Sequence, residues 1–253
     1  MKVISLNTWG GEAGVKSLLD FFAAHKDVDI FCLQEVWNGG EEMLDKNTGG
    51  SWLNRRVPTL LSDISAILSE YKVFYRPHFH DFFGLALFIK RDIKVTEEGD
   101  LYIYKEQGYI SPEEFGDHAR ILQYVTIEIE NKLHTLIQLH GLWNGKGKGD
   151  CDERLEQSDR IAGFVSKLPN PTVLVGDFNL RPDTDSLKRI EKIGLRNLIN
   201  EYGIVSTRTS HYTKSEKFAD YAFVSEGIEV LDFTVLPDEV SDHAPLYLEY
   251  SLS

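Results

Sequence analysis

The hydrophobic pattern of the first part of the chain predicts alternating strands and helices. Residues 2–7 and 29–34 are short apolar runs that are typical of buried strands. Residues 12–26 and 52–71 instead repeat apolar side chains at helical spacing, the second despite a proline near its start. A β-α-β arrangement at the start of the chain would place two parallel strands side by side and bring their polar ends to one edge.

The middle and the end of the chain predict a different arrangement. Strand-like runs follow one another without intervening helices at residues 72–75, 84–90, 93–104, 121–129 and 134–140. Further on, helices are predicted at 153–168 and 184–193, and strands at 172–175, 218–224, 229–235 and 246–250. Closely spaced strands are typical of antiparallel pairing. We therefore expect an α/β (α+β) fold, a four-layer α/β/β/α sandwich of two mostly antiparallel or mixed sheets. We expect residues 1–253 to form a single domain.

Composition narrows the class of protein. Apolar residues make up 42% of the chain, as in globular proteins, and the two cysteines lie in contexts too different for a disulfide framework. The chain has no leader-like segment and no apolar run near the ~20 residues that span a bilayer, so we expect a cytoplasmic protein. The formal charge of −13 argues against a strong basic surface for nucleic acid. We expect a monomer.

Polar residues gather where predicted strands end. They are Asn7, Gln34-Glu35, His140, Asp177-Phe178-Asn179, Asp220 and Ser241-Asp242-His243. Carboxylate and amide oxygens are the ligands that a hard divalent cation prefers, and carboxylates and imidazoles move protons. Each motif alone is weak, but six in this order along one chain predict a metal-dependent hydrolytic site.

The ordered set resembles the endonuclease/exonuclease/phosphatase superfamily, which has the DNase I-like fold. The resemblance extends from Asn7 to His243. It implies a catalytic domain that hydrolyses phosphodiester or phosphomonoester bonds with Mg²⁺ or Mn²⁺. By this resemblance, Glu35 would ligate the metal with help from Asn7 and Asp242.

The resemblance also implies roles for the other residues at these strand ends. Asp177 would orient or deprotonate the attacking water, and Asn179 would donate to a phosphoryl oxygen. On extended backbone their side chains would point the same way. His243 would contact the phosphate as a cation, because Asp220 would raise its pKa and fix its tautomer. His140 would contact the phosphate or protonate the leaving group.

Several neighbouring residues suggest contacts to the substrate. Arg120 and Arg181 could bind phosphate as guanidinium forks, and Trp143 could stack on a planar group. Tryptophans at positions 9, 37 and 143 are, as a group, better explained by packing, with at least one in the core. Residues 144–149 form a locally basic Gly/Lys loop, either a substrate lid or a mobile connector. The His78-x-His80 pair allows a zinc site, but we favour a surface position for it.

The substrate class stays open at this point. One alternative is a nuclease or a DNA-repair phosphodiesterase, although Pro182 follows Arg181 where tyrosyl-DNA phosphodiesterases have an acidic residue. A second is a phospholipid or inositol-phosphate phosphatase, or a sphingomyelinase-like hydrolase. A third is a catalytically silent binding module on the same fold. Loss of Glu35, Asp177 or His243 would indicate this last alternative, and all three are present.

Overall fold

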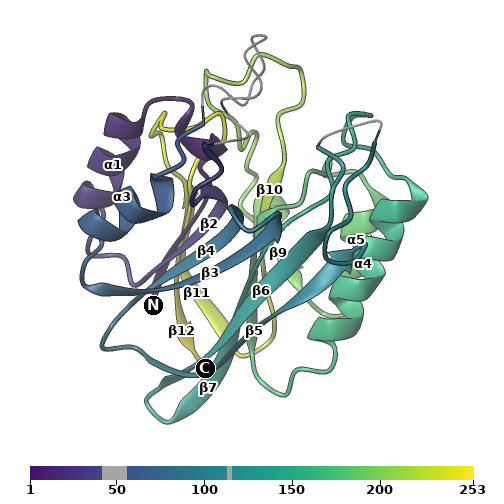
Figure 1. Ribbon diagram of the computed structural model, residues 1–253. Helices are drawn as coiled ribbons and strands as arrows, with labels where there is room; N and C mark the ends of the chain where they lie inside the picture. Colours follow the sequence, from purple (N-terminus) through teal and green to yellow (C-terminus); the bar gives the residue numbers. More distant parts are fainter. Residues whose placement is uncertain (42–55, 113–115) are drawn as a thin grey trace.

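The computed structural model describes residues 1–41, 56–112 and 116–253 (Figure 1). Two six-stranded sheets pack face to face, with helices on both outer sides. The predicted four-layer sandwich is therefore confirmed. No helix in these ranges is long and apolar enough to cross a membrane.

The first sheet has the strand order β11-β12-β1-β2-β4-β3. Its strands are β1 (Lys2–Asn7), β2 (Ile30–Trp37), β3 (Tyr71–Phe79), β4 (Phe83–Lys90), β11 (Ile228–Val235) and β12 (Leu246–Leu252). The predicted β-α-β start is present, because β1 and β2 are parallel and Asn7 pairs with Gln34. The other neighbours are antiparallel. The sheet thus combines the first and last segments of the chain.

The second sheet has the strand order β5-β6-β7-β8-β10-β9. Its strands are β5 (Lys94–Tyr104), β6 (Arg120–Ile129), β7 (Lys132–His140), β8 (Thr172–Asp177), β9 (Arg196–Asn197) and β10 (Asp220–Val224). The only parallel pair among these described strands is β7 with β8, which sets His140 beside Asp177. The antiparallel β8–β10 pair sets Asp177 beside Asp220. Three predicted site residues therefore lie in one row.

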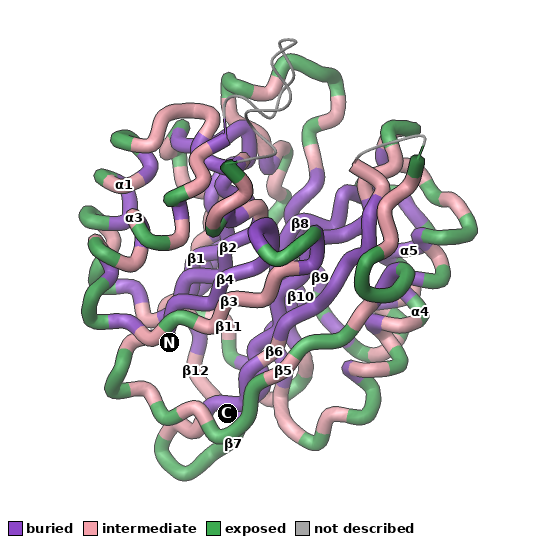
Figure 2. Tube along the Cα trace, viewed as in Figure 1, coloured by how far each residue is buried: buried purple, intermediate pink, exposed green. Residues whose placement is uncertain are grey.

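Helices cover the outer faces of the sandwich. The helical elements are the 3₁₀ helix η1 (Trp9–Gly11), α1 (Val15–Ala24), α3 (Leu60–Ile67), α4 (Asp152–Val165), α5 (Asp185–Glu191) and α6 (Leu198–Glu201). Helices α1 and α3 pack together beside the first sheet, and α4 and α5 beside the second (Figure 1). The buried backbone lies mainly in the strands between these helices (Figure 2). Helices α1 and α3 therefore shield the outer face of the first sheet from water, and α4 and α5 shield that of the second.

Two predicted helices are shorter in the structure. The helix predicted at 12–26 begins at Val15, because Gly14 has a φ of 129° that a right-handed helix does not allow. The helix predicted at 52–71 begins at Leu60 after a turn at Pro58 and ends at Ile67. The part of that prediction at 52–55 lies outside the described residues. Apolar periodicity extends past both ends of α3 because Val57 and Leu68 also pack in the core.

A chain of buried glutamines joins the two sheets below the strand ends. Gln34 Nε2 donates to Gln138 Oε1 at 2.9 Å, and Gln138 Nε2 donates to Gln123 Oε1 at 2.9 Å. Gln123 Nε2 then donates to the Phe74 carbonyl at 2.8 Å. All three glutamines are fully buried. Since a broken link would leave an amide unpaired in a dry interior, the chain specifies how the sheets face each other.

Candidate active site

Strand register brings the predicted polar residues to one edge of the sandwich. Asn7 ends β1 beside Gln34, so Glu35 follows at the same rim. His140 and Asp177 are paired at the ends of β7 and β8. The two rows belong to different sheets, and the packing of the sheets makes them face each other.

Three residues at this rim have strained backbone. Glu35 has a φ of 56° at an irregularity in β2, and Asn179 has a φ of 54° just after β8. Trp9 has a φ of 51°. Non-glycine residues rarely adopt this left-handed region, and each one costs on the order of 1–3 kcal/mol. The fold holds these residues in conformations that aim their side chains at the pocket.

A pocket of about 410 Å³ opens at this rim. Most of the predicted site residues line it: Glu35, Arg120, His140, Trp143, Asp177, Asn179, Asp242 and His243. Asn7 and Asp220 lie behind the lining, where they hydrogen-bond to residues in it. Glu35, Asp177, Asn179 and His243 therefore share one cleft.

Asn7 links the two carboxylates at the centre of the pocket. Its Nδ2 donates to Glu35 Oε1 at 3.1 Å and to Asp177 Oδ2 at 2.9 Å. Its Oδ1 accepts from the backbone N–H of Trp9 at 3.0 Å, which fixes the amide orientation. Because the amide is fully buried, it holds Glu35 and Asp177 at a set separation.

His243 and Asp220 form a buried pair on the opposite wall. His243 Nδ1 lies 2.8 Å from Asp220 Oδ2, and Nε2 lies 3.7 Å from Asp177 Oδ2. Burial and then Arg208 lower the pKa of His243 to about 3, and burial raises the pKa of Asp220 to about 6. The Asp220 carboxylate accepts from Nδ1, so the ring carries a proton on this nitrogen. The expected cationic ring stays a prediction: the charges of Asp242 and Asp177 favour it, and burial opposes it.

Arg120 fixes the tautomer of His140. Its Nη1 donates to His140 Nδ1 at 3.0 Å, so the ring proton sits on Nε2. Nε2 lies 3.7 Å from Asp177 Oδ2 and 3.9 Å from Glu35 Oε1. Burial and then Arg120 lower the pKa of His140 well below its usual value. Arg120 was expected to be a phosphate fork; it lines the pocket but is buried, and its guanidinium donates to His140 and to the Gly116 carbonyl.

The chain matches the model of the Endonuclease/Exonuclease/phosphatase family over residues 4–243. The chain belongs to this family. Family members are hydrolases that act on phosphoester bonds. A search of curated proteins finds no match.

Solved structures of other proteins share the fold. A functionally unknown conserved protein from Enterococcus faecalis V583 is 20% identical, with a TM-score of 0.75 and 100% of both chains covered. A mannosyl-6-phosphatase from Bacteroides thetaiotaomicron VPI-5482 is 19% identical, with a TM-score of 0.72 and the same coverage. D. rerio TDP2 complexed with single-strand DNA product is 15% identical, with a TM-score of 0.72 and 99% and 98% of the chains covered. At these identities the likeness extends to the fold alone.

The oxygen-rich centre of this family member fits a hard divalent cation. Asp242 Oδ1 is buried and has no hydrogen-bond partner among the described residues, which is costly for a carboxylate oxygen. Burial, and then the charges of Glu35 and Asp177, raise the pKa of Asp242. A bound cation would offset this repulsion. Ligand atoms of Asp177, Asp220 and His243 also lie within 4.8 Å of one another and could hold a metal ion.

Two sequence-based expectations about the site are corrected. Arg181 does not line the pocket; its half-exposed side chain pairs with Asp183 at 3.3 Å. Asp177 and Asn179 do converge, but not by strand alternation, because Asn179 is not in extended backbone. Instead the Asn179 N–H donates to Asp177 Oδ1 at 2.8 Å and closes a tight turn. A side chain-to-backbone bond of this kind is common for aspartate.

Two neighbouring features differ from expectation, and a third agrees with it. Residues 144–149 are a fixed loop, because the buried Arg154 donates to the Gly147 carbonyl at 2.6 Å and the Gly149 carbonyl at 2.5 Å. His78 is buried against His118 rather than on the surface, whereas His80 is exposed. Of the three tryptophans, Trp37 is the one in the core, as expected for at least one.

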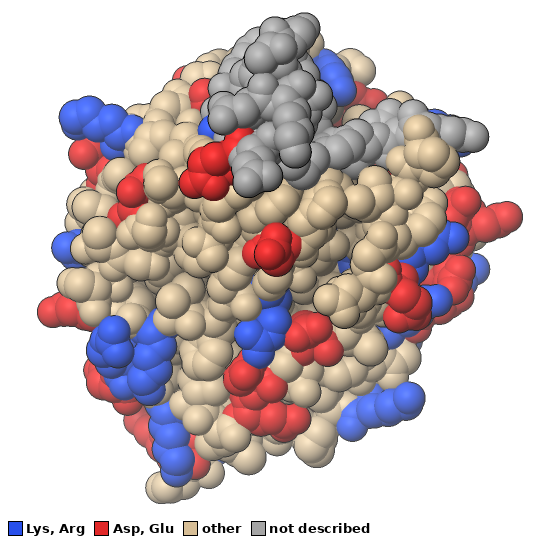
Figure 3. All heavy atoms as spheres, viewed as in Figure 1, with Lys and Arg blue, Asp and Glu red and all other residues tan. Residues whose placement is uncertain are grey.

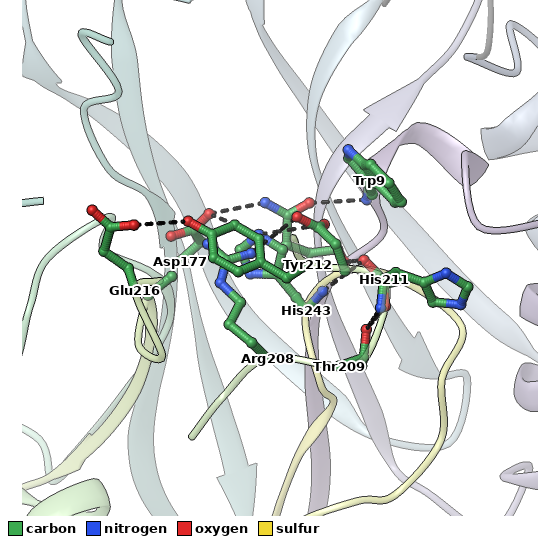
Figure 4. Close-up of polar contacts among 12 residues, drawn as sticks. Trp9, Asp177, Arg208, Thr209, His211, Tyr212, Glu216 and His243 are labelled. Carbon is green, nitrogen blue, oxygen red and sulfur yellow. Dashed lines mark hydrogen bonds and ion pairs between the residues drawn. The ribbon is translucent and has the colours of Figure 1, made fainter. Parts of the chain in front are cut away.

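Sequence reasoning missed residues that line the pocket from its loops. Arg208, Tyr212 and Lys214 come from the polar segment before β10, which has no periodic pattern. Figure 4 shows the Tyr212 ring lying over Arg208, close to Asp177 and His243. Lys148 was noted only as part of a basic loop. No signal in the sequence indicates that these side chains turn inward.

Proposed function

We propose that this protein is a divalent-metal-dependent phosphoester hydrolase whose catalytic unit spans residues 1–253. The observation that carries the proposal is the Asn7 amide, which bridges Glu35 and Asp177 beside two imidazoles in one pocket. Two carboxylates kept close together by a neutral donor suit one cation and one activated water.

Glu35 and Asp242 would hold Mg²⁺ or Mn²⁺, with Asn7 fixing the orientation of Glu35. The bound ion would polarise a phosphoryl oxygen and stabilise the leaving oxygen. The orphaned Asp242 Oδ1 supports this assignment. Arg208 Nη1 donates to the other oxygen, Oδ2, at 3.1 Å and so leaves Oδ1 free for a ligand role.

The remaining side chains would act on water and on the phosphoryl group. Asp177 would accept the proton of the attacking water, since its Oδ2 faces the pocket between both imidazoles. His140 would donate its Nε2–H to a phosphoryl oxygen, because Arg120 occupies Nδ1. His243, held through Nδ1 by Asp220, would contact the same group through Nε2 in its cationic form, in which Nε2 also carries a proton. Asn179 would add an amide donor from the strained turn.

The charge of the chain favours small phosphoesters over long nucleic acids. The net charge is −13, and on the face in Figure 3 acidic side chains are interspersed with the basic ones. Non-specific nucleic-acid binding depends on neutralising many phosphates at once. A mannosyl-6-phosphatase and TDP2 share the fold, so both substrate classes occur on it. We expect only weak, salt-sensitive DNA binding.

The test is hydrolysis of p-nitrophenyl phosphate and bis-p-nitrophenyl phosphate with Mg²⁺ or Mn²⁺ and after EDTA. Turnover should require the metal and fall about 10²–10⁴-fold in Asp177→Asn. The exposed Asp183→Asn is the matched control and should keep full activity. Absence of metal-dependent turnover on both esters would favour the catalytically silent binding module.

A further inference from the structure

A buried lysine ammonium in the pocket makes no hydrogen bond to any of the described residues. Lys148 lines the pocket and is 3% exposed. Its Nζ makes no hydrogen bond within the described residues and lies 5.8 Å from the centroid of the Tyr212 ring. Burial, opposed by the charge of Asp177, lowers the pKa of Lys148 to about 8. The charges of Asp177, Asp220 and Asp242 favour the cation, but none of these carboxylates accepts a hydrogen bond from Nζ.

Arg208 adds a second cation beside Lys148. Its guanidinium lies 4.0 Å from the centroid of the Tyr212 ring (Figure 4), the same ring that lies 5.8 Å from Lys148 Nζ. Nη1 donates to Asp242, but Nε is buried without a hydrogen bond in the part of the chain that the structure describes. The two positive charges repel each other, and Arg208 further lowers the pKa of Lys148. Neither Asp242 nor the ring neutralises both cations.

The Lys148 loop is built to keep this ammonium inside. Buried Arg154 donates to the carbonyls of Gly147 and Gly149, the two neighbours of Lys148. The Lys148 carbonyl accepts from the backbone N–H of Arg181 at 2.9 Å. An exposed position two residues earlier, at Lys146, shows that the loop could also place a lysine in solvent. A costly buried charge that the backbone holds on both sides points to a ligand.

We propose that Lys148 and Arg208 form a subsite for the second negative charge of a phosphomonoester dianion. The proposal rests on the proposed function and narrows its substrate class. Five lysine or arginine side chains and three carboxylates line the pocket, so basic groups outnumber acidic ones in the lining although the chain is strongly acidic. Such a field concentrates anions at the pocket. The two buried cations would each meet a phosphoryl oxygen when the ester binds.

The chemistry favours a monoester over a diester. A monoester carries up to two charges on three terminal oxygens, whereas a diester carries one charge on two. The metal and the two imidazoles would bind the phosphoryl oxygens nearest Asp177. The additional charged oxygen would bind Lys148 and Arg208. In a diester, the second ester group would replace that oxygen and leave both cations unpaired, which a buried site penalises strongly.

The experiment compares Lys148→Met with Lys146→Met, which removes the same charge from the surface of the same loop. Rates are measured on p-nitrophenyl phosphate and bis-p-nitrophenyl phosphate with saturating Mn²⁺. In Lys148→Met, kcat/KM for the monoester should fall about 10–100-fold, as expected for a lost charged contact, and for the diester less than about threefold. Lys146→Met should change neither rate. Calorimetric titration with inorganic phosphate should show about tenfold weaker binding in Lys148→Met alone.

The outcomes separate the subsite from the proposed function. Equal losses on both esters, or unchanged phosphate binding in Lys148→Met, would overturn the subsite while leaving phosphoester hydrolysis intact. If the unaltered protein hydrolyses neither ester, the proposed function fails, and the phosphate titration still decides the subsite. Because methionine replaces an unpaired buried charge, Lys148→Met should melt at the same or a higher temperature than the parent. Lys148→Arg should retain the preference for the monoester.

Discussion

Asn7 Nδ2 donates a 2.9 Å hydrogen bond to Asp177 Oδ2, joining the end of a strand in one sheet to the end of a strand in the other. The same nitrogen donates to Glu35. The separation of the two sheets therefore sets the distance between the carboxylate proposed to hold the metal and the one proposed to activate water. Packing of the sandwich thereby becomes a determinant of the chemistry.

Replacing Asn7 should loosen this link. In Asn7→Ala, the two carboxylates lose their shared donor, and the Mg²⁺ concentration at half-maximal activity should rise about 10–100-fold. A metal titration of activity measures the change. Asn200→Ala, which removes an exposed amide, is the control. An unchanged metal requirement in Asn7→Ala would show that the bridge does not position Glu35.

Metal binding should also be visible without catalysis. A ligand that binds only the folded state raises its melting temperature by mass action. Saturating Mn²⁺ should therefore raise the melting temperature of the parent protein, and Glu35→Gln should abolish most of that shift. Glu226→Gln, at an exposed position outside the pocket, should keep it. A full shift in Glu35→Gln would place the ion elsewhere.

Gly176, the residue before Asp177, should not tolerate a side chain. A Cβ there would lie 2.2 Å from the Leu139 carbonyl oxygen, and its φ of +138° disfavours other residues. Gly176→Ala should lower the free energy of unfolding by roughly 3–5 kcal/mol. Gly163→Ala, in α4 with open space around it, should instead raise it by about 0.5–1 kcal/mol. Urea denaturation of both variants tests the contrast.

The burial of His134, far from the pocket residues, leads us to expect that the folded protein loses stability in acid. Its Nε2 pairs with the Tyr250 hydroxyl at 2.8 Å, and burial, followed by the N-terminal charge, lowers its pKa to about 4. Between about pH 6.5 and 4, the unfolded chain binds a proton here that the folded protein does not. Stability therefore falls as pH falls through this window, by on the order of 3 kcal/mol from this group.

The His134→Phe variant isolates this contribution. The variant lacks the titrating group. As pH falls from 6.5 to 4, the unfolding free energy of the parent should therefore fall relative to that of the variant. Other titrating groups are common to both proteins and cancel in the difference. Parallel stability curves across that range would contradict the assignment.

The fold and the centre of the pocket could be predicted because their signals are local. A strand that ends in polar residues, such as the one before Glu35 or Asp177, is recognisable from adjacent residues and does not depend on the loops. The family resemblance then assigned those ends to one site. The lowered pKa of His243 was not predictable, because it depends on burial by segments distant in sequence. The motifs place Asp220 near His243, but they do not show that this pair lies in a dry interior.

Loop residues escaped prediction for a related reason. Arg208 and Tyr212 lie in a polar segment whose inward direction is set only by contacts with residues such as Asp242. The Gly/Lys loop has the composition of a flexible segment, yet Arg154 holds it in place from the following helix. The composition of the loop indicates flexibility, but the Arg154 guanidinium outside the loop fixes its conformation.

The left-handed backbone of Trp9, Glu35 and Asn179 has a consequence for the evolution of this protein. Substitution by glycine at any of them would relieve torsional strain and so favour the folded state, but it would remove a pocket side chain or a residue beside it. Selection for heat resistance alone would therefore favour substitutions at these three positions that reduce activity. Variants recovered from a stability screen without an activity screen should accumulate changes there first.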